Sequence, residues 1–361
     1  MFEKPLVLGV TGATGMIGDA LVRFLASKPS ISILALVRRP SRFAGGNVET
    51  ILGDLFNRAA LEQLISRSDV LIHLAARNPQ TEERDRKDQL LFFETNSLGA
   101  MNIARLSAQH QKRLVHVSSV AVYELSRRTS GTFDEQEQLP GRPETTEWVE
   151  KAQTFLAHLV AEWMKEGSTN VPSRELSKFL EGSFPPQNER IYSLSKFLGE
   201  PQIDLLQEGV VVRLSDVYGP GHKSRGIIQD CLSAFLGGKE VVIDFGLCGL
   251  VSFIHMRDVL QTLLTAVTTS SDIPHVINVA SPTSVSETSL EDCLKDIGSE
   301  AGVSSAIRVR RTTPAQQFRT FDVKKMKQYL GFEKPLSLPE GVRRTIHCLR
   351  HNAGQVHDHH S

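Results

Sequence analysis

A tyrosine and a lysine one helical turn apart are the residues of this chain whose types and spacing point most directly to chemistry. Tyr192 and Lys196 stand in the run IYSLSK, and positions i and i+4 of a helix share one face. An ammonium group beside a phenol favours the phenolate and would lower the tyrosine pKa from about 10. Such a tyrosine can exchange a proton with a substrate hydroxyl or carbonyl near neutral pH. A solvated helix face has the same pattern, so the rest of the sequence has to decide.

Three glycines near the N-terminus form a second candidate site. The run VTGATGMIGDAL places Gly12, Gly15 and Gly18 between a strand-like stretch at 6–10 and a helix-like stretch at 16–27. Glycines permit a tight turn and a close approach of the backbone to a pyrophosphate, and the helix N-terminus offers free N–H groups. The spacing differs from the standard GxGxxG, but the order of strand, glycine loop and helix predicts a dinucleotide site.

The elements that have to position these groups alternate between strand and helix. Stretches typical of helices lie at 16–27, 58–67 and 88–110. Apolar runs typical of buried strands lie at 6–10, 31–37, 48–53, 69–76, 113–119, 210–217 and 275–280. This alternation predicts an α/β fold, a Rossmann-like doubly wound parallel sheet covered by helices.

The same pattern predicts the division into domains. We expect residues 1–218 to form a Rossmann domain that binds the dinucleotide, with a further core strand at about 275–280. Residues 219–250 and 281–350 are more irregular and are expected to form a smaller C-terminal substrate-binding α/β region. The polar, His-rich residues 351–361 are expected to be a disordered tail.

Residues 141–190 interrupt the alternation with a helical insertion. Trp148, Ala152, Phe155, Leu159 and Trp163 recur at helical spacing, so this apolar stripe has to be buried. Packing on the body of the protein, a lid and a subunit interface are the alternatives. Because the insertion enters between the strand at 113–119 and Tyr192, we hypothesise that it covers the substrate pocket.

A series of short motifs follows the glycine loop in a fixed order. They are GDL (53–55), HLAA (73–76), TNSLGAMNI (95–103), HVSSVAVYE (116–124), YSLSK (192–196), RLSDVYGPG (213–221) and SFIHMRDV (252–259). Together with TGATGMIG they resemble the extended short-chain dehydrogenase/reductases, in the NAD-dependent epimerase/dehydratase branch. The resemblance covers roughly residues 5–345, and it makes a chance occurrence of the Tyr–Lys pair improbable.

The resemblance implies roles for the matching residues. Ser119 would hydrogen-bond the substrate oxygen, Tyr192 would be the acid/base, and Lys196 would also hold the nicotinamide ribose. Asn96 would order the site rather than react. The residues expected at the cofactor are Gly12, Thr14, Gly15, Met16, Ile17, Gly18, Arg38, Arg39, Asp54, Leu55, Leu74, Ala75, Ala76, Asn96, Ser118 and Lys196. We expect no metal.

The run LALVRRPSR, at the end of the second predicted strand, bears on the choice of cofactor. NAD enzymes of this fold usually place an acidic residue here, which accepts hydrogen bonds from the ribose 2′-OH. Val37 occupies that position, and Arg38 and Arg39 follow it. Arginine suits a 2′-phosphate through charge-assisted hydrogen bonds, although arginines solvated at the surface would look the same. We therefore predict NADP(H), with NAD as the alternative.

Two departures from the family pattern bear on the substrate. Nucleotide-sugar members usually carry an Arg for the substrate diphosphate before the FIH segment, where this chain has Val251 and Ser252. They often carry an Asn before VYGP, where this chain has Asp216. A carboxylate that faces a diphosphate repels it. The candidates to compensate are Arg225, Arg310 and Arg311.

These features define three hypotheses of function. The first is an NAD(P)-dependent oxidoreductase that transfers hydride at a carbonyl or secondary alcohol of a small-molecule, possibly sugar-derived, substrate. The alternative is a nucleotide-sugar epimerase or dehydratase with a retained NAD. The second alternative is a non-catalytic dinucleotide-sensing protein, against which the intact Ser119, Tyr192 and Lys196 argue. The arginines and the missing diphosphate Arg favour the first hypothesis, and the family match favours the epimerase about as much.

The composition limits partners and location. The chain has 361 residues, with 40% hydrophobic and 23% charged residues and a formal net charge of zero. This balance gives no drive toward nucleic acid or an anionic membrane. The cysteines lack zinc or CxxC spacing, and we see no signal peptide or membrane-spanning run. We expect a cytoplasmic protein with a small-molecule substrate, and a homodimer because family members are often dimers.

Overall fold

The computed structural model describes residues 5–41, 43, 46–78, 86–166, 173–183, 185, 190–221, 226–245, 248–269, 273–301, 306–310 and 317–356. The chain separates into two compact units. Unit 1 comprises Met1–Arg127, Gln136–Arg213 and Leu264–Ile277. Unit 2 comprises Arg128–Glu135, Leu214–Leu263 and Asn278–Ser361. The main boundary therefore falls at Arg213, a few residues before the position expected from the sequence.

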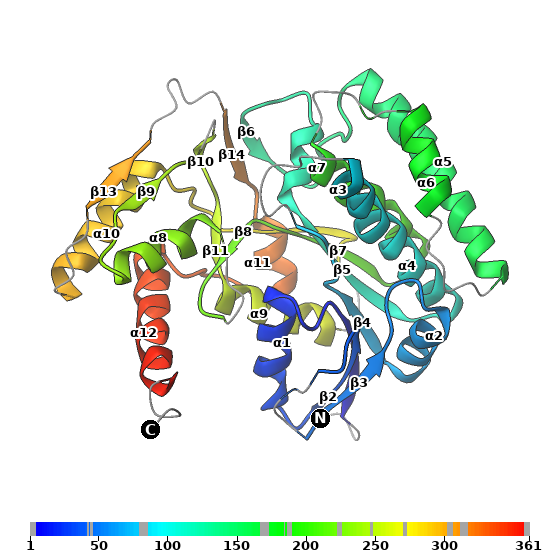
Figure 1. The fold of residues 1–361 in the computed structure, drawn as a ribbon, viewed down its shortest axis with the longest axis horizontal. Helices are drawn as coiled ribbons and strands as arrows, with labels where there is room; N and C mark the ends of the chain where they lie inside the picture. The colour runs from blue at the N-terminus through cyan, green and yellow to red at the C-terminus, as the bar shows by residue number, and fades with distance from the viewer. Residues whose placement is uncertain are drawn as a thin grey trace. The chain divides into compact units, whose positions relative to one another are not determined.

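A seven-stranded sheet has the order β12-β7-β5-β4-β1-β2-β3. The pairs that join β3, β2, β1, β4 and β5 are parallel. The prediction of a Rossmann-like α/β fold is confirmed (Figure 1). The strands are β1 (Leu6–Thr11), β2 (Ile31–Val37), β3 (Val48–Leu52), β4 (Val70–His73), β5 (Arg113–Ser119), β7 (Gly209–Leu214) and β12 (Val276–Val279).

The run expected to form one strand over 210–217 is divided between two sheets, so that prediction is wrong in detail. β7 ends at Leu214, and β8 (Asp216–Tyr218) pairs in parallel with β11 (Phe253–His255). The Ser215 nitrogen still donates to the Val279 carbonyl at 3.0 Å, whereas the Asp216 nitrogen donates to the Ser252 carbonyl at 3.2 Å. The chain thus changes its partner strand between two consecutive residues, which hydropathy alone does not reveal.

Helices cover the sheet of unit 1 on both faces. α2 (Arg58–Arg67), α4 (Gly99–Gln109) and α7 (Ile191–Gly199) lie side by side on one face, and α1 (Met16–Ala26) lies on the other (Figure 1). The helix expected over 88–110 contains a π-helical turn, η1 (Phe93–Leu98), between α3 (Arg86–Phe92) and α4. A π-turn of this kind often accompanies a functional site, and this one contains Asn96.

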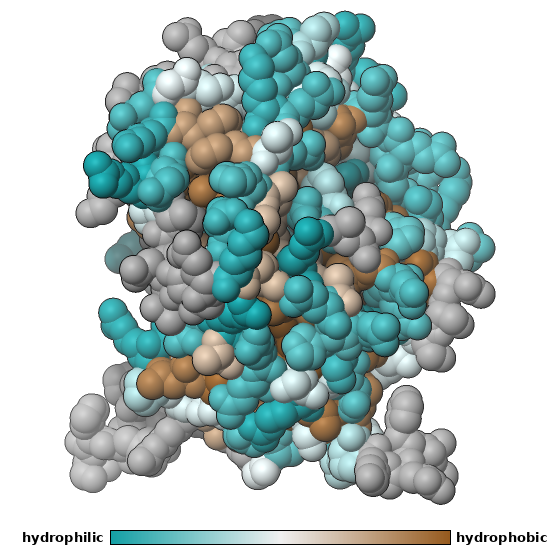
Figure 2. Space-filling view, turned by 90° about the vertical axis from the view of Figure 1, so that its right-hand side faces the viewer, coloured by the Kyte–Doolittle hydropathy of each residue, from teal (hydrophilic) through white to brown (hydrophobic). Residues whose placement is uncertain are grey.

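The insertion forms a helical hairpin of α5 (Pro143–Glu166) and α6 (Ser173–Gly182). Trp148, Ala152, Leu159 and Trp163 are buried, and α5 packs along α4 and α7. Figure 2 looks onto the side that carries α5 and α6 and shows a mainly hydrophilic surface with separate hydrophobic areas. The apolar stripe therefore packs on the body of unit 1, as the simplest of the three alternatives requires.

Phe155 takes a different part in the hairpin. Its ring stacks on Phe179 of α6 with centroids 4.4 Å apart, and it is only half-buried. Pro143 opens α5, a position where its missing N–H leaves no hydrogen bond unmade. The two helices are thus joined to each other as well as to unit 1.

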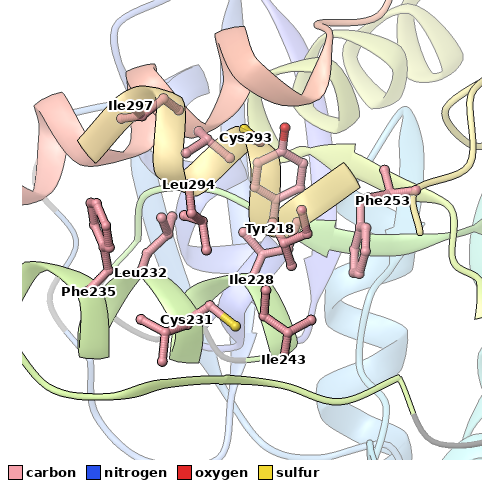
Figure 3. Packing of buried hydrophobic residues seen from close by; sticks show 14 of the residues in the cluster. Tyr218, Ile228, Cys231, Leu232, Phe235, Ile243, Phe253, Cys293, Leu294 and Ile297 are labelled. Atoms are coloured by element: carbon pink, nitrogen blue, oxygen red, sulfur yellow. The ribbon is translucent and has the colours of Figure 1, made fainter. Parts of the chain in front are cut away.

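Unit 2 has its own hydrophobic core, which includes Tyr218, Leu232, Phe253 and Leu294 (Figure 3). Its strands are β6 (Gly131–Phe133), β8, β9 (Val241–Ile243), β10 (Cys248–Leu250), β11, β13 (Ile307–Val309) and β14 (Gln317–Phe321). Its helices include α8 (Ile227–Leu236), α10 (Glu287–Ala301), α11 (Lys324–Leu330) and α12 (Leu338–Val356). The short helix η3 (Pro201–Leu205) belongs to unit 1, and α9 (Met256–Thr268) crosses the boundary between the units.

The C-terminal stretch differs from the predicted disordered tail. α12 continues to Val356, so its last turns occupy residues that composition alone assigned to the tail. Residues 357–361 lie outside the described part of the chain. Across the described ranges, no helix combines the length and apolar character that crossing a membrane requires.

Candidate active site

The glycine loop between β1 and α1 has the geometry of a dinucleotide site. Gly12 has a φ of 73°, a conformation that favours glycine, and a Cβ there would lie 2.5 Å from the Ala75 nitrogen. A Cβ at Gly18 would lie 2.1 Å from the Gly12 carbonyl oxygen. The first turn of α1 leaves backbone N–H groups for a pyrophosphate, so the loop fits a dinucleotide. Of the predicted contacts, Thr14, Met16 and Ile17 are half-buried and Gly15 is exposed.

The ends of β2 and β3 carry the residues predicted to contact the adenosine half. Arg38 and Arg39 are both exposed, directly after the buried Val37. The exposed Asp54 accepts hydrogen bonds from the Phe56 and Asn57 nitrogens, at 2.8 and 2.9 Å, and thereby shapes the turn into α2. Leu55 is buried, and a Cβ at Gly99 would lie 2.5 Å from its side chain. The side chain of Leu55 is therefore packed inside, and only its backbone is left for a cofactor.

The loop after β4 is tied to the glycine loop through Thr11. Thr11 Oγ1 lies 2.7 Å from His73 Nδ1 and accepts a hydrogen bond from the Ala75 nitrogen at 3.4 Å. The Leu74 nitrogen donates to the Thr11 carbonyl at 3.1 Å. Leu74 and Ala75 are half-buried and Ala76 is exposed. These predicted cofactor residues thus adjoin the glycine loop.

Asn96 joins the same loop to the helix that carries Tyr192. Its Oδ1 accepts from the Arg77 nitrogen at 2.8 Å, and its Nδ2 donates to the Arg77 carbonyl and to Ser195 Oγ, each at 3.0 Å. Ser195 Oγ in turn donates to the Tyr192 carbonyl at 2.9 Å. Both amide donors of Asn96 are used within the chain. Its contacts are those of a residue that orders the site.

The two serines at the end of β5 have different environments. Ser119 is half-buried, and its Oγ accepts a hydrogen bond from the Ala121 nitrogen at 3.1 Å, which caps the short helix η2 (Val120–Leu125). Its own hydroxyl proton is therefore available for another acceptor. Ser118 is buried, and its Oγ donates to Glu200 at 2.5 Å. The hydroxyl of Ser118 is thus engaged inside the protein, and a cofactor contact from Ser118 would have to come from its backbone.

Tyr192 and Lys196 lie on α7 in contrasting environments. The half-buried Tyr192 donates from its hydroxyl to Asn78 Oδ1 at 3.3 Å, and its ring meets Phe92 edge-on with centroids 6.1 Å apart. Lys196 is 2% exposed, and its Nζ donates to the Val117 carbonyl at 2.8 Å. Burial lowers the pKa of Lys196 to about 8, and the charge of Glu200 acts in the opposite direction. The pKa of this lysine is therefore well below the usual value of 10.5.

Sequence reasoning missed two buried groups beneath these residues. Glu200 forms an ion pair with Arg213, with Oε2 and Nη2 2.7 Å apart. The rings of His73 and His116 stack on adjacent strands with centroids 5.3 Å apart. Burial lowers the pKa of His73 to about 3 and that of His116 well below its usual value, with the charge of Lys196 acting in the same direction. The sequence did contain a signal for the ion pair: Arg213 is a charged residue in the apolar run VVVRL, and a charged residue in a buried strand requires a partner.

The fold, the glycine loop and the Tyr–Lys helix together define a class: a Rossmann-type enzyme that works with a nicotinamide dinucleotide. The sequence model of the NAD dependent epimerase/dehydratase family matches residues 8–173 and 161–280. The chain belongs to this family, within the extended short-chain dehydrogenases/reductases, as predicted.

Individual relatives are similar over nearly the whole chain. A UDP-glucose 4-epimerase of Vibrio cholerae is 23% identical over 375 residues, which cover 96% of each protein. UDP-glucuronic acid decarboxylase 1 of Xenopus tropicalis is 23% identical over 353 residues, which cover 94% of this chain and 71% of the relative. The structure of MoeE5 in complex with UDP-glucuronic acid and NAD superposes with a TM-score of 0.69 at 22% identity, covering 96% and 99% of the two chains. The family is described as NAD dependent and the similar structure contains NAD, so these comparisons do not support the prediction of NADP as the first choice.

Proposed function

We propose that this enzyme interconverts a nucleotide sugar and keeps NAD bound throughout the turnover. The names of the relatives support the proposal, since they describe an epimerase and a decarboxylase of UDP-sugars. One observation in this chain carries it: the buried Lys196 reaches the strand that ends in Ser119 and lies one turn from Tyr192. This is the arrangement that proton exchange at a sugar hydroxyl requires.

The three side chains have separate tasks in this reaction. Tyr192 Oη takes the proton of a sugar hydroxyl during oxidation and returns it during reduction. Lys196, while positively charged, favours the phenolate and holds the ribose of the cofactor. Ser119 donates a hydrogen bond to the reacting oxygen. The bound nicotinamide supplies the acceptor and donor of the hydride at the carbon that carries this oxygen.

A net NADP(H)-dependent reductase is the second candidate, and specific residues favour it. Arg38 and Arg39 are exposed at the end of β2, where they suit a 2′-phosphate. In unit 2, Asp216 is exposed and Val251 stands where nucleotide-sugar enzymes usually carry an Arg. Of the candidates to compensate, Arg310 is exposed after β13, and Arg225 and Arg311 lie outside the described residues.

The nucleotide carried by the purified protein distinguishes the two candidates. We expect denaturation to release NAD or NADH in a one-to-one ratio to protein. The protein should then convert one of a panel of UDP- and dTDP-hexoses and uronic acids, followed by NMR, without added cofactor. The Tyr192→Phe variant should keep the nucleotide and lose the conversion. An empty site that binds NADPH much more tightly than NADH and consumes it would replace this proposal with the reductase.

The role of the arginines needs a separate measurement. If they bind a 2′-phosphate, the double variant Arg38→Ser/Arg39→Ser should lose NADP(H) affinity by about tenfold or more per lost ion pair, and NAD(H) affinity should change little. Because we propose NAD as the working cofactor, we expect the wild-type protein to bind NAD(H) more tightly than NADP(H). Equal affinity of the wild-type protein for NAD(H) and NADP(H) would mean that neither arginine selects between the two cofactors.

We also propose a cytoplasmic homodimer. The family resemblance supports the dimer, and the free, buried Cys231 and Cys293 are consistent with a reducing compartment. Because α5 packs along α4 and α7, an interface on this side would have to use the outer face of α5. Light scattering on the purified protein, with Glu150→Arg on that face, would test the dimer and its location together.

A further inference from the structure

Glu200 is a buried carboxylate at the end of the helix that carries Tyr192 and Lys196. α7 ends at Gly199, and Pro201 begins the short helix η3, because a proline does not continue the α-helical hydrogen bonding. Glu200 follows Lys196 by one helical turn, so the two side chains leave the helix on the same side. The side chain of Glu200 is 6% exposed, so its charge has to be compensated inside the protein.

Two neighbours hold the carboxylate in place. Arg213 donates from Nη2 to Oε2 at 2.7 Å and from Nε to Oε1 at 3.2 Å, a two-point contact. Ser118 donates from Oγ to Oε1 at 2.5 Å. The guanidinium of Arg213 also lies over the Tyr123 ring at 5.0 Å. Glu200 therefore ties α7 to β7 and to the residue of β5 that directly precedes Ser119.

The same carboxylate is the negative charge that acts on Lys196. The other titratable groups that interact with Lys196 are His73 on β4 and His116 on β5, and Arg213 on β7 is paired with Glu200. The pKa of each histidine is lowered, mainly by burial, so both are neutral at physiological pH and offer no compensating charge. Burial also lowers the pKa of Lys196, and the attraction of Glu200 opposes this effect.

We propose that Glu200 is a positioning residue that keeps Lys196 positively charged and holds the end of β5 in the place from which Ser119 acts. This inference rests on the proposed function of Ser119, Tyr192 and Lys196. Glu200 touches neither substrate nor cofactor in this scheme, and it acts through Lys196 and Ser118. Two consequences follow, one electrostatic and one geometric, and different variants separate them.

The electrostatic consequence has a definite sign. The folded-state pKa of Lys196 is about 8 with Glu200 present, and loss of a nearby negative charge lowers a lysine pKa further. Lys196 would then lose its proton at a lower pH. If the charged lysine is needed for turnover, the alkaline limit of activity moves to lower pH in a variant without this charge.

The variants Glu200→Gln, Glu200→Asp and Ser118→Ala form a matched set. Glutamine keeps an acceptor for Arg213 and Ser118 but removes the charge. Aspartate keeps the charge on a shorter side chain. Ser118→Ala removes the tether to β5 and leaves every charge in place. For Glu200→Gln, we expect the alkaline limb of the pH profile, where kcat falls at high pH, to move to lower pH by about one unit. Ser118→Ala should lower kcat at all pH values without moving the limb, and Glu200→Asp should move the limb less than Glu200→Gln does, because it keeps the charge but holds it farther from Lys196.

A second readout does not depend on turnover. The ε-carbon resonance of Lys196, in protein labelled with ¹³C-lysine and assigned by its absence in Lys196→Met, reports the protonation of this lysine directly. We expect its titration midpoint to move down in Glu200→Gln and to stay in place in Ser118→Ala. If the wild-type protein converts no nucleotide sugar but the midpoint moves, the function proposal fails and the electrostatic role of Glu200 stands.

The inference about Glu200 is overturned if folded Glu200→Gln protein shows neither shift. It is overturned equally if Ser118→Ala moves the limb as far as Glu200→Gln does, because Glu200 would then act through structure alone. Should Glu200→Gln fail to fold, Glu200→Asp carries the test. In that case the shorter side chain moves the charge away from Lys196, so a midpoint below the wild-type value in folded Glu200→Asp supports a role of the charge and an unchanged midpoint counts against it.

Discussion

Lys196 Nζ donates a 2.8 Å hydrogen bond to the carbonyl oxygen of Val117. Val117 lies in β5 shortly before Ser119, so this bond joins the helix that carries Tyr192 to the strand that carries the serine. The ammonium group is thereby held inside the protein, where burying its charge costs free energy. A buried lysine of this kind makes the site sensitive to substitution and to pH.

The first prediction concerns Tyr192. Removing its hydroxyl in Tyr192→Phe eliminates the proton acceptor and should lower kcat by about 10²–10⁴-fold. The ring contact with Phe92 is kept, so folding and nucleotide binding should be unchanged. Steady-state kinetics with a converted sugar and fluorescence titration of NADH measure the two effects. Activity within a few-fold of wild type would exclude Tyr192 as the acid/base.

The second prediction concerns the stability cost of Lys196. Its pKa is lowered from 10.5 to about 8 by burial, and one pKa unit corresponds to about 1.4 kcal/mol. Below pH 8, folding therefore buries a charge at a cost on the order of 3 kcal/mol. The variant Lys196→Met should be more stable than the wild type at pH 7, by about 2–3 kcal/mol.

The pH dependence gives this prediction its sign check. Between pH 8 and 10.5 the unfolded lysine binds a proton that the folded one has released, so wild-type stability rises with pH. The advantage of Lys196→Met should shrink over this range in urea unfolding of the cofactor-free protein. Lys239→Met, at an exposed position, is the control and should show no such trend. A Lys196→Met protein less stable at pH 7 would refute the prediction.

The third prediction concerns the glycine loop. A methyl group at Gly18 would lie 2.1 Å from the Gly12 carbonyl oxygen, so Gly18→Ala has to displace the loop from α1. We expect the affinity for NAD to fall by about tenfold or more, equivalent to about 1.4 kcal/mol. Gly46→Ala meets no atom within 4 Å and should behave as wild type in isothermal titration calorimetry. Unchanged affinity in Gly18→Ala would place the dinucleotide elsewhere.

The fourth prediction concerns Asn96. Asn96→Ala removes three hydrogen bonds and leaves the backbone groups of the half-buried Arg77 without these partners. We expect a loss of about 2–4 kcal/mol in the free energy of unfolding and a higher Kd for NAD. Asn102→Ala removes the hydrogen bond from Asn102 Nδ2 to the Leu55 carbonyl at 3.1 Å and should cost about 1 kcal/mol. Equal effects of the two variants would deny Asn96 a special role.

The fifth prediction concerns the helical hairpin. Trp148 is 5% exposed, packs on Phe93 and donates from Nε1 to the Ser183 carbonyl at 2.9 Å. Trp148→Ala should lower stability by about 3–5 kcal/mol, and Phe155→Ala, at a half-buried position, should lower it less. If the hairpin acts as a lid over the substrate pocket, deleting residues 145–183 should change the substrate KM and leave cofactor affinity nearly intact. The packing of α5 predicts loss of the fold instead, and circular dichroism of the deletion variant decides between them.

Much of the architecture was predictable because it depends on local patterns. Buried strands in a parallel sheet are continuously apolar, and amphipathic helices repeat every 3.6 residues. The strands at 31–37 and 113–119 and the helix at 58–67 were therefore placed at the observed bounds. The partner change between Ser215 and Asp216 was not predictable, since both residues follow the same apolar run.

The motifs alone determined the family and the chemistry that this protein can perform, because a glycine loop, a serine at a strand end and a Tyr–Lys pair constrain residue types at short range. The tertiary structure decided which of these groups face inward and what surrounds them. The protonation of Lys196 depends on burial and on Glu200, and the hydroxyl of Ser118, next to Ser119, is engaged by that same carboxylate. Desolvation and charge–charge interactions act between residues far apart in the chain, so only the folded protein determines them.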